Sequence, residues 1–211
     1  MKLSMTAGVA FLSLALFCTS AVASDSAASV AVKAKPTNAL TFGKSLPPVG
    51  YVEFCSHGQA ECKSKFKDAG VLAMSPENWN MLHQVNTYVN GKIRPKSDIE
   101  LYHVAEKWTY PTSSGDCEDY VLLKKRYLQS MGFSADQLLI TVLLDEKSEG
   151  HAVLTIVSDN GDFILDNRRD DILRWDQTPY KFLKRQSQQD PKQWVSLQKN
   201  TTQVLASTKS K

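Results

Sequence analysis

The fold of this chain is decided by residues 115–131, which read GDCEDYVLLKKRYLQSM. One stripe of residues in this segment recurs at spacings of three and four: Cys117, Val121, Lys124, Leu128 and Met131. This spacing predicts a helix that begins at or just before Cys117, with Gly132 as its terminator. The thiol of Cys117 would therefore lie in the first turn of a helix.

The groups around this thiol shift its pKa in opposite directions. Free backbone N–H groups and the helix dipole favour an anion at a helix start, which lowers the pKa of a cysteine there. The carboxylates of Asp116, Glu118 and Asp119 oppose this, because nearby negative charge raises a thiol pKa. Hard oxygen ligands packed this closely suit Ca²⁺, which would neutralise them. The alternative, that these acids only complement the helix dipole, stays open on these residues alone.

Strands are predicted beyond this helix at Leu138 to Leu144, His151 to Val157 and Asp162 to Asp166. The last two are joined by a turn containing Asn160-Gly161, a strong hairpin signal. His151 begins one strand and Asp166 ends the next, so the hairpin brings a base and an acid towards the thiol. Such a set has the order nucleophile, base and orienter.

The register of this hairpin matters for that interpretation. If Asn160-Gly161 formed a simple two-residue loop, Asp166 would face Thr155, four residues from His151. A bulge, strong twist or altered pairing is then required to bring His151 and Asp166 together.

The remaining segments complete an α+β pattern. A helix is predicted from Pro76, with Ser75 as its N-cap, because apolar residues recur from Trp79 to Ile93 at helical spacing. A further strand is predicted from Tyr180 to Arg185, and the charged run 168–171 is predicted to be a solvated loop. A helix followed by antiparallel strands gives an α+β fold in which the helix packs on a sheet.

The N-terminus has the features of a secretory signal peptide. An apolar core at 7–17 precedes Ala21-Val22-Ala23, so cleavage is expected after Ala23 and the product is expected in the periplasm. In an oxidising compartment Cys55 and Cys62 are expected to form a disulfide. Cys117 is then left as an unpaired thiol, since Cys18 is discarded with the signal.

Composition excludes some partners. The net charge is +3 with acidic and basic residues interspersed, so no basic stripe for nucleic acid is present. No later apolar segment predicts a membrane anchor. The predicted organisation is a signal peptide at 1–23, a flexible lead-in at 24–45, one catalytic domain at 46–200 and a flexible tail at 201–211.

Three motifs together resemble the bacterial transglutaminase-like cysteine proteinases. They are GDCEDY at 115–120, GHAVLT at 150–155 and LDN at 165–167. Shorter matches support the resemblance: Val85-Asn86, Val89-Asn90, Glu106-Lys107-Trp108 and Arg185-Gln186-Ser187. The resemblance implies a papain-like fold of the transglutaminase type, with Cys117 as nucleophile, His151 as base and Asp166 as orienter.

The resemblance also implies ligands and partners. Relatives of this family need calcium, and Asp116, Glu118 and Asp119 match their calcium-binding positions. Those relatives are periplasmic proteases that cut a giant surface adhesin and so release the cell from its biofilm. An inner-membrane receptor that senses cyclic di-GMP sequesters them. The expected function is therefore a calcium-dependent endopeptidase with a protein substrate.

Some features stay open. The backbone N–H of Cys117 is one expected oxyanion donor, and Asn86, Asn90 and Trp108 are the candidates for a side-chain donor. A thioester can be resolved by an amine as readily as by water, so acyl transfer is an alternative activity. A non-catalytic binding module that keeps the same scaffold is a third hypothesis.

Overall fold

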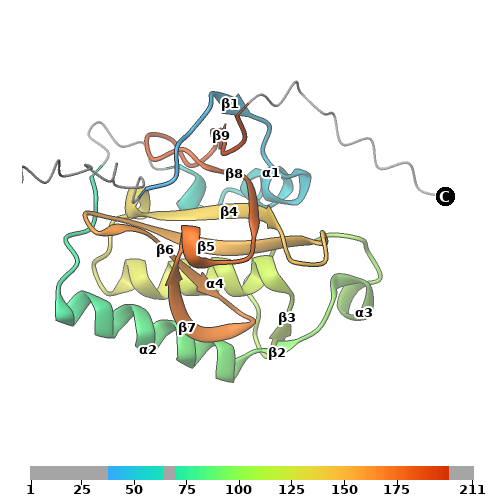
Figure 1. Cartoon of the computed structure of the whole chain (residues 1–211). Helices are drawn as coiled ribbons and strands as arrows, with labels where there is room; N and C mark the ends of the chain where they lie inside the picture. Colours follow the sequence, from blue (N-terminus) through green and yellow to red (C-terminus); the bar gives the residue numbers. More distant parts are fainter. Residues whose placement is uncertain (1–37, 64–69, 200–211) are drawn as a thin grey trace, which may run out of the picture. The chain divides into compact units, whose positions relative to one another are not determined.

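The computed structural model describes residues 38–63 and 70–199 (Figure 1). The predicted signal peptide and the predicted tail at 201–211 lie outside the described residues. Within the described ranges, none of the helices combines the length and the apolar character that crossing a membrane requires.

The centre of the fold is a seven-stranded antiparallel sheet with the strand order β1-β9-β8-β4-β5-β6-β7 (Figure 1). Its strands are β1 (Lys44–Ser45), β4 (Leu138–Leu144), β5 (Gly150–Ser158), β6 (Gly161–Asp166), β7 (Arg169–Arg174), β8 (Lys181–Gln186) and β9 (Trp194–Ser196). A separate parallel pair joins β2 (Arg94–Pro95) to β3 (Ser114–Gly115). The strands predicted from alternation, including the one at Tyr180 to Arg185, are present with shifts of about one residue at their ends.

Two long helices cover one face of this sheet. They are α2 (Pro76–Lys92) and α4 (Cys117–Ser130), which lie side by side against the sheet in Figure 1. Shorter elements are α1 (Val49–Ser56), α3 (Asp98–Tyr102), and the 3₁₀ turns η1 (Ala60–Cys62), η2 (Ala135–Gln137) and η3 (Trp175–Gln177). The mixed architecture confirms the predicted α+β class.

Both predicted helix starts are confirmed by their local chemistry. At α2 the Ser75 hydroxyl accepts a hydrogen bond of 3.1 Å from the backbone N–H of Asn78, and Pro76 occupies the first helical position. The helix α4 begins at Cys117, and Gly132 follows it with a φ of 97°, a conformation that favours glycine. The thiol therefore lies in the first turn, as the spacing predicted.

The main core lies between the two long helices and the sheet. Its fully buried side chains include Leu82, Val85 and Val89 of α2, Leu128 of α4, and Leu154, Ile156 and Leu165 of the sheet. A smaller cluster is formed by Leu143, Val153, Ile164 and Phe182. Neighbouring residues of β5 alternate between these two clusters, as a strand buried on both faces requires.

One prediction about ordered structure was wrong. The charged run 168–171 is not a loop, because all but its first residue belong to β7. This edge strand pairs with β6, where Leu173 lies opposite Ile164. Its charged side chains face solvent, while Ile172 is buried. The lead-in at 24–45 is described from Asn38 onward, and there it is bonded to the domain: the Asn38 amide donates to Asp162 at 2.8 Å, and β1 pairs with β9.

The packing of the core predicts that two leucines contribute very differently to the free energy of unfolding. Leu82 is completely buried, whereas 65% of Leu46 is exposed. We expect Leu82→Ala to lower the free energy of unfolding by about 2–5 kcal/mol, because it loses buried area and leaves a cavity. Leu46→Ala should change it by less than about 1 kcal/mol. Urea denaturation of both variants checks this; equal losses would contradict the described packing.

Candidate active site

The Cys117 thiol is half-buried at the N-terminus of α4 and is the only free thiol in the described part of the chain. The chain enters the helix through Gly115, and a Cβ at that position would lie only 2.5 Å from Asp119 Oδ2. A side chain on residue 115 would therefore push the Asp119 carboxylate away. The close packing against Asp119 therefore requires a glycine at position 115, two residues before Cys117.

His151 and Asp166 form a buried pair. His151 Nε2 lies 2.9 Å from Asp166 Oδ1, and both side chains are almost completely inaccessible to solvent. Nε2 donates to the carboxylate, which leaves Nδ1 as the ring nitrogen with a free lone pair. Nδ1 is buried and makes no hydrogen bond with any described residue. This arrangement orients an imidazole to act as a base.

The register of the hairpin explains how the pair meets. Ser158 pairs with Gly161 and Leu154 with Leu165, so the two-residue loop is 159–160 and not 160–161. One further step would set Asp166 opposite Val153, only two residues from His151 and on its face. Diagonal neighbours of this kind are within reach of each other. An altered pairing, one of the expected solutions, is the one that the structure adopts.

The strand that carries His151 also reaches the thiol. Burial and the negative charge of Glu118 raise the pKa of Cys117 well above its ordinary value, while the backbone N–H of Ala152 acts in the opposite direction. Ala152 follows His151 directly, so the start of β5 lies against the start of α4. Glu118 Oε2 accepts a hydrogen bond of 3.1 Å from the thiol. The carboxylates around the thiol therefore oppose its ionisation.

A cluster of carboxylates lies beside Cys117. Oxygen atoms of Asp98, Asp116 and Glu118 lie within 4.8 Å of one another. Burial, followed by the charge of Glu118, raises the pKa of Asp116 to about 8. One oxygen each of Asp98 and Asp116 is buried without a hydrogen bond to any described residue. Buried, mutually repelling hard oxygens fit a divalent cation such as Ca²⁺.

The predicted cation ligands are only partly brought together. Asp116 and Glu118 belong to the cluster, whereas Asp119 accepts a hydrogen bond of 2.9 Å from the backbone N–H of Thr109. Burial raises the pKa of Asp119 to about 7. Asp98 takes the third place in the cluster, and sequence reasoning missed it. Asp98 follows β2 and Asp116 follows β3, so the parallel pairing of these two strands brings the two residues together. No local sequence signal predicts this pairing.

The side chains considered as oxyanion donors have other partners. Asn86 donates both amide hydrogens to the carbonyls of Arg169 and Asp170, at 3.1 Å each. Asn90 donates to the carbonyls of Asp166 and Arg169 at 3.0 Å. The Trp108 indole donates to Glu106 at 2.8 Å. None of these three offers a free N–H, and the two asparagines instead tie the β6–β7 turn to α2.

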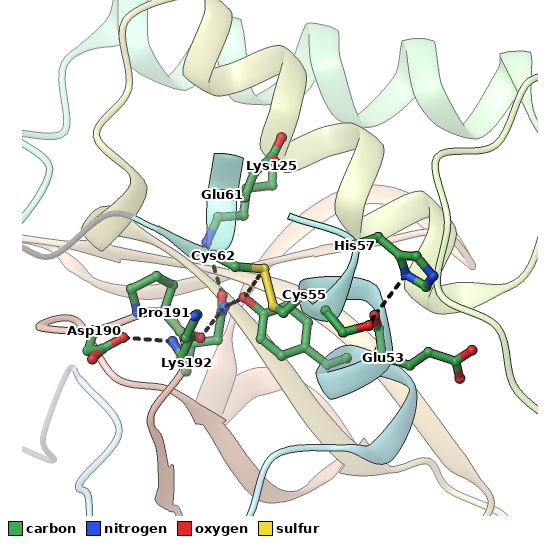
Figure 2. The surroundings of a disulfide bond; sticks show 12 residues. Glu53, Cys55, His57, Glu61, Cys62, Lys125, Asp190, Pro191 and Lys192 are labelled. Carbon is green, nitrogen blue, oxygen red and sulfur yellow. Dashed lines mark hydrogen bonds between the residues drawn. A yellow bond between two sulfur atoms is a disulfide. The ribbon is translucent and has the colours of Figure 1, made fainter. Parts of the chain in front are cut away.

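The disulfide expected between Cys55 and Cys62 is present and joins the end of α1 to η1 (Figure 2). Figure 2 also shows the buried Lys125, which donates to Gln186 at 2.9 Å and to the carbonyl of Leu138 at 2.6 Å. Next to Cys62, Glu61 accepts a hydrogen bond from the Tyr110 hydroxyl. The disulfide thereby supports the segment that leads towards Thr109 and Asp119.

Comparison with solved structures gives the same fold. Calcium-bound LapG of Legionella pneumophila matches with a TM-score of 0.50 and 22% identity, over 63% of this chain and 76% of that one. LapG and EGTA-treated LapG of the same organism match with TM-scores of 0.43 at 23% identity, over 54% of this chain and 65% and 64% of theirs. The first match supports a transglutaminase-like protease fold. Comparison with curated proteins gave no match.

The family assignment comes from the sequence as a whole. The family model of the bacterial transglutaminase-like cysteine proteinases matches residues 41–202, which include the thiol, the imidazole and the carboxylate described above. This match covers most of the chain and confirms the resemblance seen in the three motifs. The chain belongs to the bacterial transglutaminase-like cysteine proteinase family and is a cysteine protease.

Proposed function

We propose that this protease is a calcium-dependent endopeptidase that cleaves a periplasmic or surface protein, with Cys117 as nucleophile, His151 as base and Asp166 as orienter. The observation that carries the proposal is the buried His151–Asp166 pair, 2.9 Å apart, at the strand end that reaches the Cys117 thiol. The N-terminal signal features support the periplasm as its location. A large surface adhesin as substrate and a cyclic di-GMP receptor as regulator are the family-based parts of the proposal.

The chemistry follows from these positions. Nδ1 of His151 takes the proton of Cys117, and Asp166 stabilises the resulting imidazolium through Nε2. The thiolate attacks the peptide carbonyl carbon, while the backbone N–H of Cys117 donates to the developing oxyanion. The imidazolium gives its proton to the departing amine, which leaves a thioester. His151 then takes a proton from water, whose oxygen attacks the thioester and releases the acid and the thiol.

The acidic cluster sets the charge around this thiol. Asp98, Asp116 and Glu118 would hold the cation, since their oxygens converge and two of them lack hydrogen bonds. When bound, a divalent cation supplies positive charge that offsets the carboxylates and favours the thiolate. Without it, these carboxylates oppose the ionisation of Cys117. A calcium requirement therefore has a physical cause in this chain.

The nucleophile is tested by a conservative change. We expect Cys117→Ser to lower proteolysis by about a thousandfold or more, because the alkoxide is much harder to form beside these acids. The surface and secreted proteomes of the source bacterium would be compared for the natural protein and the variant. Large surface proteins should pass into the medium only with the intact thiol. Transfer of a labelled primary amine to protein glutamines, dependent on Cys117, would instead overturn hydrolysis.

The cation is tested by chelation. We expect EGTA to abolish activity and to lower the melting temperature by several degrees, because a ligand that binds only the folded state stabilises it. Glu118→Gln should lose activity and the melting response to calcium, since it removes one charged ligand. Glu149→Gln, an exposed residue outside the cluster, is the matched control. Full activity in EGTA would remove calcium from the proposal.

The raised pKa values predict how the cation affects stability at different pH. In EGTA the pKa of Asp116 rises on folding from 3.8 to about 8, so the folded state holds the proton longer than the unfolded one. Stability in EGTA should fall as pH rises from about 4 to about 8. Calcium displaces this proton, so its stabilising effect should grow over the same range. Melting curves check both trends, and Asp116→Asn should flatten them; a pH-independent calcium effect would contradict the assignment.

A further inference from the structure

Tyr180 lies immediately before β8 and contacts both members of the buried pair. Its hydroxyl donates a hydrogen bond of 2.5 Å to Asp166 Oδ2. Its ring meets the His151 imidazole edge to face, with centroids 5.9 Å apart and an angle of 73° between the planes. The sequence analysis predicted Tyr180 only as the first residue of a strand. The structure gives it a contact with each partner of the pair.

The hydrogen bonds to Asp166 are divided between its two oxygens. Oδ1 accepts from His151 Nε2 at 2.9 Å and from the backbone N–H of Arg168 at 3.0 Å. Oδ2 accepts from Tyr180, the one bond to this oxygen among the described residues. The phenol therefore restrains Oδ2, while His151 and the Arg168 N–H restrain Oδ1. Burial alone would raise the pKa of Asp166, but the bonds from His151 and Tyr180 bring it down to about 2.

The surroundings of Asp166 give a reason why its rotation needs fixing. Lys124 of α4 is completely buried, and its ammonium makes no hydrogen bond with any described residue. Burial lowers the pKa of Lys124 to about 7, and the charges of Asp166 and Asp170 act against this. When Lys124 is protonated, its buried ammonium lacks a hydrogen-bond partner among the described residues and attracts a nearby carboxylate. The other nearby cation, Arg168, is already bonded to Asp145 at 2.6 Å.

We infer that Tyr180 is a positioning residue of the catalytic triad: its hydroxyl holds the Asp166 carboxylate so that Oδ1 stays on His151 Nε2. This keeps the proton on Nε2 and the lone pair on Nδ1, the nitrogen that accepts the proton of Cys117 in the proposed mechanism. Without the hydroxyl, Asp166 can turn from His151 towards Lys124. The inference rests on the proposed triad and assigns to it a fourth residue that touches no reacting atom.

The test uses iodoacetamide, because alkylation of Cys117 reports thiolate formation without knowledge of the substrate. Tyr180→Phe keeps the ring beside His151 and removes only the hydroxyl. Near neutral pH we expect alkylation of Cys117 to slow about tenfold, since a hydrogen bond to a charged group is lost. At high pH the rates should converge, because the thiol then ionises without the imidazole. Tyr127→Phe, which removes a phenol bonded to Lys92 on the α2–α4 surface, is the control and should react like the natural protein.

A double-mutant cycle separates this role from others. In an Asp166→Asn background, adding Tyr180→Phe should change the rate less than about twofold, because the residue through which Tyr180 acts is already altered. The same tenfold loss in both backgrounds, or no loss in the natural one, would overturn the inference. If Asp166→Asn itself leaves alkylation unchanged, the proposed triad fails and Tyr180 loses its role with it. Peptide mapping confirms that the label is on Cys117, and melting curves confirm that each variant is folded.

Discussion

The hydrogen-bond register between β5 and β6 is the constraint on which the site depends. It sets Leu154 opposite Leu165 and so brings His151 within reach of Asp166. A shift of one residue would turn one of the two side chains to the other face of the sheet. The same register buries Leu154 and Leu165 under the helices. The apolar core therefore enforces the geometry of a polar pair that contributes little to the core itself.

The second constraint is electrostatic. Four carboxylates lie near one half-buried thiol: Asp98, Glu118 and Asp119 are buried, and Asp116 is half-buried. Loss of contact with water raises the pKa of each. Keeping several carboxylates charged in such surroundings costs free energy. A protein that used this cysteine only for packing would gain nothing from it. Under the proposed calcium dependence, the same repulsion would make the enzyme a poor catalyst without the cation, and the cost of burying the charges would serve regulation.

The sequence predicted the parts of this molecule whose signals are local. Helical spacing placed Cys117 at a helix start, and alternation located the strands that carry His151 and Asp166. The family motifs then supplied the fold type. What could not be predicted depends on contacts between distant segments. Asp98 reaches the cluster only through the pairing of β2 with β3, and Tyr180 reaches Asp166 only when the chain returns before β8.

The errors have physical causes of the same kind. The run 168–171 is rich in charge, which is typical of a loop, yet an edge strand needs only one apolar face, and Ile172 supplies it. The hydrogen bonds of Asn86 and Asn90 could not be foreseen, because a helix pattern does not reveal which carbonyls lie opposite.

These two asparagines have a consequence for how other chains can approach. An open sheet edge is a template on which a further strand can pair. At β7 the carbonyls of Arg169 and Asp170 already accept hydrogen bonds from asparagine amides, and the opposite edge, β1, is only two residues long. Two carbonyls of the β7 edge are therefore already occupied, and β1 offers only a short template. Both features limit the backbone pairing that an added strand could make at these two edges.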